Sequence, residues 1–258
     1  MVLLALDTTA GSCSVALLRE GRIASRCVDA GQSGPPAHSQ LLLPMIEALL
    51  AEAGTPLSAL DAIAFGAGPG SFTGLRIACG VAQGLALAID RPVVPVDSLS
   101  AMAWASGQGD VIACLDARMG EVYVAAYRVH RRPDEVDRVD GACASIEQVL
   151  APAVCAPGAV PVPAGHGWSG CGNGFAVHGP SLRARLPGLV AVDASVQPDA
   201  RAVAVLGALG LRAGRAVDAA LAVPLYVRDK VALDATEQAA LRAGAALARS
   251  AATSGGAR

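Results

Sequence analysis

Residues 66–76 read GAGPGSFTGLR and join an apolar strand at 61–65 to a long helix, rich in glycine and alanine, at 73–89. Four glycines within nine residues let the backbone turn tightly and leave its N–H groups uncovered. Such a helix start attracts anions, because free N–H groups and the helix dipole point the same way. The stretch differs from a P-loop, since the only lysine of the chain is Lys230. Two interpretations stay open: an anion-binding turn, and a strand–helix turn that needs small residues for packing.

The composition favours a globular protein whose core is built from small aliphatic side chains. Of 258 residues, 53% are hydrophobic and only 3% aromatic, so Ala, Val and Leu must fill the core. The net charge is −2, and the pair Arg131 and Arg132 is too small a basic cluster for a nucleic-acid groove. Seven cysteines without a C-x-x-C pair are typical of reduced thiols and favour the cytoplasm. Apolar runs such as 77–89 fall below the roughly 18 residues of a membrane span, so no membrane insertion is expected.

The order of the predicted elements indicates an α/β protein with mixed sheets flanked by helices. The first half predicts strands at 2–7, 12–19, 21–28, 61–65 and 92–96 and helices at 38–53, 73–89 and 98–105. The pattern restarts with strands at 111–116 and 121–128, one or two helical turns at 145–150, a glycine cluster at 169–174 and a helix at 200–213. We therefore predict a first subdomain at 1–106, a reduced second subdomain at 107–232 and an alanine-rich tail at 233–258.

Five motifs in a fixed order resemble the TsaB family. They are LALDTT (4–9), HSQLLLP (38–44), GPGSFTGLR (68–76), DARMGEVY (116–123) and PLYVR (224–228). The resemblance runs from residue 2 to about 232 and implies the actin-like, sugar-kinase-like and Hsp70-like fold with two related subdomains. It also implies an accessory subunit of the bacterial machinery that makes threonylcarbamoyladenosine on tRNA, next to the anticodon. In that machinery the paralogue TsaD is catalytic, TsaE is a separate ATPase, and the TsaB protein binds TsaD without performing the chemistry.

The histidines do not predict a metal site. The resemblance implies that the catalytic paralogue holds its metal with two histidines one helical turn apart, which places both rings on one face. Here His38 begins the corresponding helix, but the residue four positions later is Leu42. We therefore expect no metal-dependent catalysis.

A degenerate phosphate site is predicted where actin-like ATPases hold phosphate and Mg²⁺. Asp7, Thr8 and Thr9 lie at the tip of the first strand pair, and Asp116 occupies the matching place in the second half. Weak binding of ATP or ADP with Mg²⁺ inside a complex is compatible with these residues, and no tightly bound cofactor is expected. The alternative is that these are turn residues inherited with the fold.

The first two long helices are predicted to carry a partner interface. Gly80, Gly84 and Ala88 follow one another at four-residue intervals, which lets another helix approach closely, and the apolar stripe of the helix at 38–53 is wider than one core contact needs. The predicted interface residues are His38, Leu42, Met45, Ile46, Leu49, Arg76, Ile77, Gly80, Val81 and Gly84. The resemblance implies that this face binds TsaD, or a second copy when the chain is alone, but not both at once. TsaE is a further implied partner, and tRNA is expected only through the complex.

The sequence is compatible with three functions to different degrees. We predict a non-catalytic subunit that binds TsaD and supports threonylcarbamoyl transfer. The alternative is an ATP-binding or ATP-hydrolysing enzyme of the same fold that uses Asp7 and Asp116. A peptidase is disfavoured, because neither Ser71 nor Ser169 lies in a Gly-x-Ser-x-Gly elbow after a strand.

Overall fold

The computed structural model describes residues 1–29, 37–107, 109–131 and 144–228, and the chain divides into the units Met1–Val227 and Arg228–Arg258. The described residues other than Arg228 belong to the first unit. The predicted tail at 233–258, Lys230 and Arg132 lie outside the described residues.

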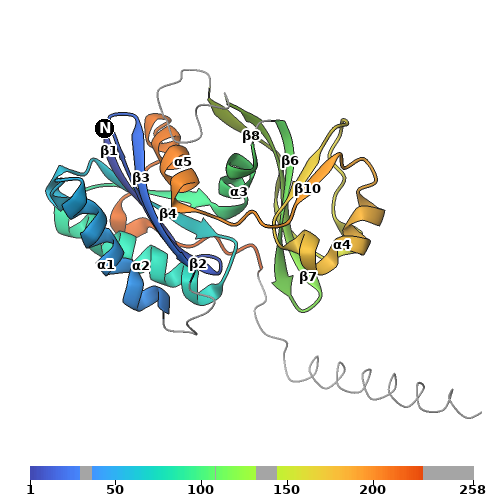
Figure 1. Cartoon of the computed structure of the whole chain (residues 1–258), viewed down its shortest axis with the longest axis horizontal. Helices are drawn as coiled ribbons and strands as arrows, with labels where there is room; N and C mark the ends of the chain where they lie inside the picture. Colours follow the sequence, from blue (N-terminus) through green and yellow to red (C-terminus); the bar gives the residue numbers. More distant parts are fainter. Residues whose placement is uncertain (30–36, 108, 132–143, 229–258) are drawn as a thin grey trace, which may run out of the picture. The chain divides into compact units, whose positions relative to one another are not determined.

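The first sheet has five strands in the order β3-β2-β1-β4-β5 (Figure 1). Its strands are β1 (Val2–Asp7), β2 (Ser12–Arg19), β3 (Arg22–Asp29), β4 (Ala62–Gly68) and β5 (Val93–Asp97). β1 pairs antiparallel with β2 and parallel with β4. Successive side chains of β1 point to opposite faces: Leu4 and Leu6 pack with α1 (Ala37–Glu52) and α2 (Phe72–Ile89), whereas Leu3 and Ala5 pack with α3 (Ser98–Ser106) and α5 (Ala200–Arg212). This sheet is therefore covered by helices on both faces.

The second sheet also has five strands, in the order β10-β9-β6-β7-β8. They are β6 (Gly109–Arg118), β7 (Glu121–His130), β8 (Ser145–Cys155), β9 (Ser169–Cys171) and β10 (Ala191–Asp193). One face packs with Phe175 and Leu182 of α4 (Gly174–Arg185), and the other contributes Ala113 and Tyr127 to the cluster that contains α3. Short helical turns lie at Leu57–Ala59, Pro157–Ala159 and Ala219–Leu221.

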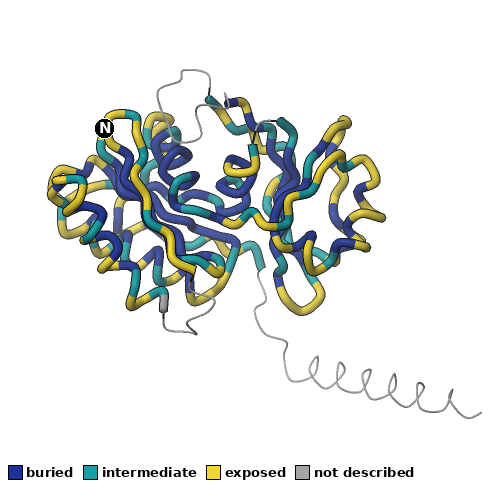
Figure 2. Tube along the Cα trace, viewed as in Figure 1, coloured by how far each residue is buried: buried dark blue, intermediate teal, exposed yellow. Residues whose placement is uncertain are grey.

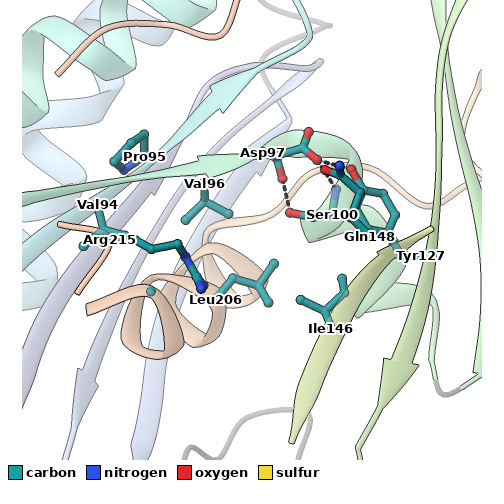
Figure 3. Close-up of a pocket in the computed structure, with 11 residues that line it drawn as sticks. Val94, Pro95, Val96, Asp97, Ser100, Tyr127, Ile146, Gln148, Leu206 and Arg215 are labelled. Atoms are coloured by element: carbon teal, nitrogen blue, oxygen red, sulfur yellow. Dashed lines mark hydrogen bonds between the residues drawn. The ribbon is translucent and has the colours of Figure 1, made fainter. Parts of the chain in front are cut away.

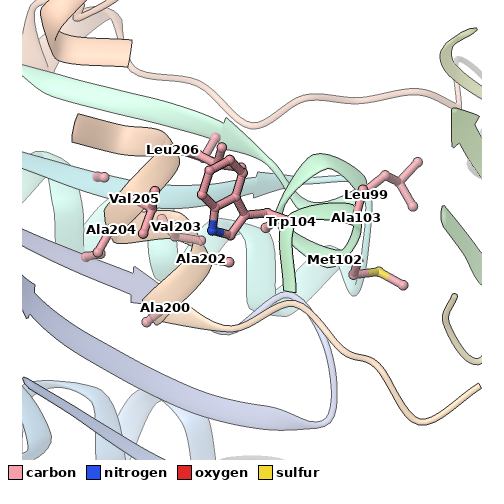
Figure 4. Close-up of a cluster of buried hydrophobic side chains, with 14 of the residues drawn as sticks. Leu99, Met102, Ala103, Trp104, Ala200, Ala202, Val203, Ala204, Val205 and Leu206 are labelled. Carbon is pink, nitrogen blue, oxygen red and sulfur yellow. The ribbon is translucent and has the colours of Figure 1, made fainter. Parts of the chain in front are cut away.

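α3 and α5 form the layer shared by the two sheets. Trp104 of α3 is 1% exposed and lies among the small side chains of α5 (Figure 4). Small residues let the two helices approach closely, which is why a chain with few aromatic residues can fill this layer. Arg131 is also buried, with its guanidinium 5.7 Å from the centre of the Trp104 ring, so it is not an exposed RNA contact. Burial is continuous along the central strands, while β3 and the outer helix faces are exposed (Figure 2).

The structure differs from the prediction at residues 145–150, and it places α5 against the first sheet. The helical turns predicted at 145–150 are the first half of strand β8, which pairs antiparallel with β7 from His130↔Ser145 to Val122↔Cys155. Glu, Gln, Leu and Ala are good helix formers, but pairing with a distant strand overrides this local preference. α5 belongs to the second half of the sequence, yet it packs against the first sheet. The subdomain boundaries at 106 and 232 stay a prediction.

Candidate functional site

The glycine-rich loop closes directly over the end of β1. The Thr8 hydroxyl donates to the Gly74 carbonyl at 2.7 Å, and the Ser71 N–H donates to the Thr9 carbonyl at 2.7 Å. Ser71 also caps α2 by accepting a hydrogen bond from the Gly74 N–H at 3.4 Å. A β-carbon on Gly74 would overlap the Thr8 carbonyl oxygen, and one on Gly70 would overlap that of Thr9. The sequence predicts for this stretch either an anion-binding turn or a turn that needs small residues for packing. Close packing accounts for the positions of Gly70 and Gly74.

Asp7, Thr8 and Thr9 are brought together as predicted, but in a closed cluster. Their exposed fractions are 0%, 0% and 1%. Asp7 Oδ1 accepts hydrogen bonds from the Thr9 N–H at 2.9 Å and the Thr9 hydroxyl at 2.8 Å. Ser98 of α3 adds a hydroxyl contact to Thr9 at 3.2 Å. The hydroxyls that an actin-like ATPase would turn toward phosphate are thus engaged inside the protein.

The Asp7 carboxylate is an unusual buried acid. Its Oδ2 atom has no hydrogen-bond partner and faces Gly66, where a β-carbon would overlap it. Burial raises the pKa of Asp7 to about 6, against the opposing effect of the Thr9 hydrogen bonds. A hydrated Mg²⁺ needs room and several oxygen ligands. The enclosed residues present here do not fit a Mg²⁺–phosphate group in this arrangement.

Asp116 lies in a second cluster at the end of β6. Its Oδ1 atom is 3.1 Å from Nε2 of His178, and its Oδ2 atom is 3.4 Å from the Arg118 guanidinium. Its N–H donates to the Asn173 side-chain oxygen at 2.9 Å, which attaches the glycine cluster at 169–174 to β6. Among the described residues, no hydrogen bond or ion pair connects Asp116 to Asp7, Thr8 or Thr9. Asp7 and Asp116 thus have different hydrogen-bond partners, and a shared phosphate site stays a prediction.

His38 and Leu42, at the two positions compared with the metal-binding histidines of the paralogue, have different surroundings. Within the described ranges, no group of three or more His, Cys, Asp or Glu side chains is placed to hold a metal ion. The Nε2 atom of His38 is buried without a hydrogen-bond partner, and burial lowers the pKa of this imidazole. Leu42 is 0% exposed and belongs to the core.

A cavity of about 250 Å³ lies between β5, α3, α5, β7 and β8 (Figure 3). Its polar end holds Asp97, which caps α3 by accepting from the Leu99 N–H at 3.0 Å and the Ser100 N–H at 3.3 Å. The Tyr127 hydroxyl donates to the same carboxylate and so connects the two sheets. Burial raises the pKa of Asp97 to about 6 and that of Tyr127 well above its usual value. No local pattern pairs Asp97 with Tyr127, because the two residues meet only when the two sheets pack on α3.

The structure corrects the α1 part of the predicted interface. Four of its residues lie in the core and are at most 7% exposed: Leu42, Met45, Ile46 and Leu49. Their stripe covers the face of the first sheet that carries Leu4 and Leu6, together with α2. The accessible apolar surface of α1 is instead the neighbouring Leu43, which is 44% exposed, together with Pro44.

The α2 part of the predicted interface lies at the surface. Arg76, Gly80 and Gly84 are exposed, Ile77 and Val81 are half-buried, and a β-carbon at either glycine would have open space around it. α2 has 18 residues, of which 33% are buried, and within the described chain it is the one helix whose length and composition would allow it to cross a membrane. Packed core helices share these properties, and the run without charged residues, 77–89, stays shorter than a membrane span. Its buried residues pack against β4 and the rest of the first sheet.

Sequence reasoning missed an aromatic cluster at the start of α2. The Arg76 guanidinium lies 3.9 Å from the centre of the Phe72 ring, and its Nε donates to the Tyr226 hydroxyl at 3.4 Å. The two rings are 6.2 Å apart between centroids. The only available signal was that Phe72 and Arg76 share one face of the helix, since the position of Tyr226 depends on the tertiary fold.

Comparisons with known proteins agree with one another. The family model of TsaD, tRNA N6-adenosine threonylcarbamoyltransferase, matches residues 35–236. Over 127 residues, 48% of this chain, the sequence is 46% identical to the tRNA threonylcarbamoyladenosine biosynthesis protein TsaB of Haemophilus influenzae, of which this covers 52%. Over 132 residues, 50% of this chain, it is 45% identical to the protein of that name from Escherichia coli, of which this covers 55%. The chain thus spans about half the length of the curated relatives it matches.

Two solved structures match over nearly their whole length. YeaZ from Pseudomonas aeruginosa is 42% identical with a TM-score of 0.75, and the match covers 87% of this chain and 99% of that one. A second structure is described as an uncharacterised protein with similarity to peptidase YeaZ, from the same organism. It is 41% identical with a TM-score of 0.75, and the match covers 88% of this chain and 99% of that one.

Proposed function

Because the chain belongs to the TsaB family, within the group matched by the TsaD family model, we propose that it is a non-catalytic partner subunit in tRNA threonylcarbamoyladenosine biosynthesis. Its fold is the actin-like α/β fold expected from the sequence. In the proposed role it works in the cytoplasm, binds TsaD, and supports transfer of threonylcarbamoyl to the adenosine next to the anticodon.

The observation that carries this proposal is the exposed outer face of α2. The exposed residues of this apolar helix are Phe72, Thr73, Arg76, Gly80, Gly84, Leu87 and Ala88. Gly80 and Gly84 leave open space above the backbone. Glycine in a helix interior destabilises it by roughly 0.5–1 kcal/mol relative to alanine. Two exposed glycines one turn apart, with no packing need inside the chain, are explained if a partner helix packs on them.

The enclosure of Asp7, Thr8 and Thr9 supports a role without chemistry of its own. The hydroxyls near Asp7 already have partners inside the protein, so they do not face a ligand site in this arrangement. Any weak affinity for ATP or ADP with Mg²⁺ is therefore assigned to the complex with TsaD and TsaE, and contact with tRNA is assigned to that complex as well.

We propose that the same α2 face also mediates self-association of the free chain. A second copy that packs on Gly80 and Gly84 would occupy the surface that TsaD requires, so the two assemblies exclude each other. Adding TsaD to the homodimer is therefore expected to yield heterodimer at the expense of homodimer, without a species that contains both contacts.

The test is reconstitution with the TsaD and TsaE proteins of the same organism, supplied with ATP and a donor of the activated threonylcarbamoyl group. Modification of unmodified tRNA is expected to require this chain, and to be unaffected by His38→Ala. Gly84→Leu is expected to abolish complex formation, because overpacking of a close helix contact costs about 1–3 kcal/mol. Gly188→Leu is the matched control, since Gly188 is exposed with open space and lies outside α2. Modification activity without this chain, or complex formation by Gly84→Leu equal to wild type, would contradict the proposal.

The ATP-dependent enzyme remains the second candidate, because Oδ2 of Asp7 is a buried acidic oxygen without a partner. Calorimetric titration of the isolated chain with ATP and Mg²⁺ tests it. Tight Mg²⁺-dependent binding that is lost in Asp7→Ala would favour the enzyme over the accessory subunit.

A further inference from the structure

Phe72 and Tyr226 are exposed, whereas the other aromatic side chains are buried or, for Tyr123, half-buried. The chain has three Phe, three Tyr and two Trp, all in the described ranges, and only these two rings are classed as exposed, at 44% and 47%. They are far apart in sequence, yet they meet at 6.2 Å between ring centroids. Exposing two of so few aromatic rings at one point indicates a contact surface rather than chance.

The segment 218–227, here called the strap, holds Tyr226 in place. The Leu225 N–H donates to the Ala67 carbonyl at 2.7 Å, and the Gln83 side chain donates to the Ala222 carbonyl at 2.9 Å. These bonds fix the strap to β4 and to the middle of α2. The Tyr226 ring is therefore positioned before any partner binds, which reduces the entropy lost on binding.

The Arg76 guanidinium is oriented by its neighbours but forms no ion pair with an acidic residue of the described chain. It is the only charged residue of α2, and no carboxylate among the described residues forms an ion pair with it. The Phe72 ring and the Tyr226 hydroxyl orient its planar guanidinium, while the strap adds the exposed side chains Leu221, Val223 and Leu225. A guanidinium in apolar surroundings pairs well with a carboxylate. A partner that buries the guanidinium without supplying a carboxylate weakens the complex, because an unpaired charge is then removed from water.

The cluster lies at one end of the small-residue face of α2. Phe72, Arg76, Gly80, Gly84 and Ala88 follow at four-residue intervals and are all exposed. A helix that packs along the three small residues has its path continued by the large side chains of the cluster. Each step of four residues turns by about 40° around the helix axis, so Arg76 lies beside Gly80 and Gly84 on one face. A helix that packs on the two glycines would therefore reach the Arg76 guanidinium.

We propose that Arg76, held between Phe72 and Tyr226, is the anchor that binds a carboxylate on the TsaD helix that packs on α2. This inference rests on the proposed function and adds to it the chemistry of the contact. A protein carboxylate fits better than RNA, because α2 carries no second basic residue, the strap beside it is apolar and the chain has a net charge of −2. The aromatic rings then shield the ion pair from water, which strengthens it.

The experiment measures the affinity of the full chain for purified TsaD by calorimetry, at low and at high salt. Arg76→Glu is expected to weaken binding by more than about 100-fold, because like charges would face each other at a covered contact. Arg183→Glu is the matched control: this exposed arginine of α4 lies on the second sheet and should leave the affinity unchanged. Phe72→Ala and Tyr226→Phe are expected to weaken binding by about 10-fold and by about 3-fold. The thermal midpoint of each variant is recorded, and if Arg76→Glu does not fold, Arg76→Met carries the test.

The variant Gly84→Leu separates this inference from the proposal on which it rests. If Gly84→Leu abolishes binding and Arg76→Glu binds like wild type, the anchor is wrong and the docking face stands. If both bind like wild type, the docking face is wrong as well. If Arg76→Glu leaves TsaD binding intact and lowers only the tRNA affinity of the complex, the cluster is a nucleobase platform and the carboxylate anchor is overturned.

Discussion

The Thr8 hydroxyl donates a 2.7 Å hydrogen bond to the Gly74 carbonyl, and the two backbones lie so close that a β-carbon on Gly74 would overlap the Thr8 carbonyl oxygen. This contact joins the end of β1 to the first turn of α2. It explains why the loop at 66–74 needs glycines, and it separates them from the glycines later in α2, which meet nothing.

The first prediction compares Gly74→Ala with Gly80→Ala, two substitutions in one helix. Gly74→Ala is expected to lower the free energy of unfolding by about 1–3 kcal/mol, because backbone must move to admit the methyl group. Gly80→Ala is expected to raise it by roughly 0.5–1 kcal/mol, since alanine favours the helix and open space surrounds the site. Urea unfolding monitored by circular dichroism measures both. Equal effects would contradict the assignment of Gly74 to close packing.

The second prediction concerns the pH dependence caused by Asp7. Burial raises its pKa from 3.8 to about 6, so the folded state binds this proton more tightly than the unfolded state does. The ionisation of Asp7 therefore lowers the free energy of unfolding of the protein as the pH rises from about 4 through 6, by about 3 kcal/mol in all. Asp7→Asn keeps an oxygen for the two Thr9 hydrogen bonds and removes the titration. The free energy of unfolding of Asp7→Asn minus that of wild type is expected to be about 2–3 kcal/mol larger at pH 8 than at pH 4.5.

The control for this pH dependence is Asp90→Asn, at the exposed C-terminal cap of α2. Its stability difference from wild type should not follow the Asp7 titration. A difference between Asp7→Asn and wild type that stays constant from pH 4.5 to pH 8 would show that Asp7 is not a buried, high-pKa acid.

The third prediction concerns the hydrogen bond between Tyr127 and Asp97, which connects the two sheets. Tyr127→Phe keeps the buried ring and removes the donor to the carboxylate. At pH 8 the substitution is expected to lower the free energy of unfolding by about 1.5–3 kcal/mol, the range for hydrogen bonds to charged groups. Below the raised pKa of Asp97, about 6, the acid is protonated and the loss should shrink. Unfolding free energies at pH 5 and pH 8 measure this, and an equal loss at both values would contradict it.

Many elements of the fold could be predicted from local pattern. Helices α1, α2, α3 and α5 and the strand pairs have regular apolar spacing, and their bounds agree with prediction to within a few residues. β8 was predicted as helical turns, because its strand conformation depends on pairing with β7 and not on its own residues. α4, β9 and β10 were not predicted: Pro180 lies inside α4, and the two strands have only three residues each.

The candidate site was harder to predict, because sequence cannot show which apolar stripe is left over after packing. The wide stripe of α1 suggested an exposed patch, yet its widest part is buried by the first sheet and α2. Similarly, Asp7 and its two threonines were correctly placed at a strand tip, but their enclosure depends on the close approach of the loop at 66–74. The meeting of Phe72 with Tyr226 depends on the path of the strap, which joins segments from opposite ends of the chain.

The last prediction uses the neighbours Leu42 and Leu43 to separate core from interface on α1. Leu42 is 0% exposed and Leu43 is 44% exposed, so the two positions have opposite environments within one helix. Leu42→Ala is expected to destabilise the fold by about 2–5 kcal/mol, because it leaves a cavity in the core. Leu43→Ala is expected to change stability by less than about 0.5 kcal/mol and to weaken binding of TsaD, or of a second copy, by several-fold. Urea unfolding and analytical ultracentrifugation of both variants provide the measurement. If Leu43→Ala leaves both assemblies unchanged, the docking surface is confined to α2 and the strap, and α1 serves only as a layer of the core.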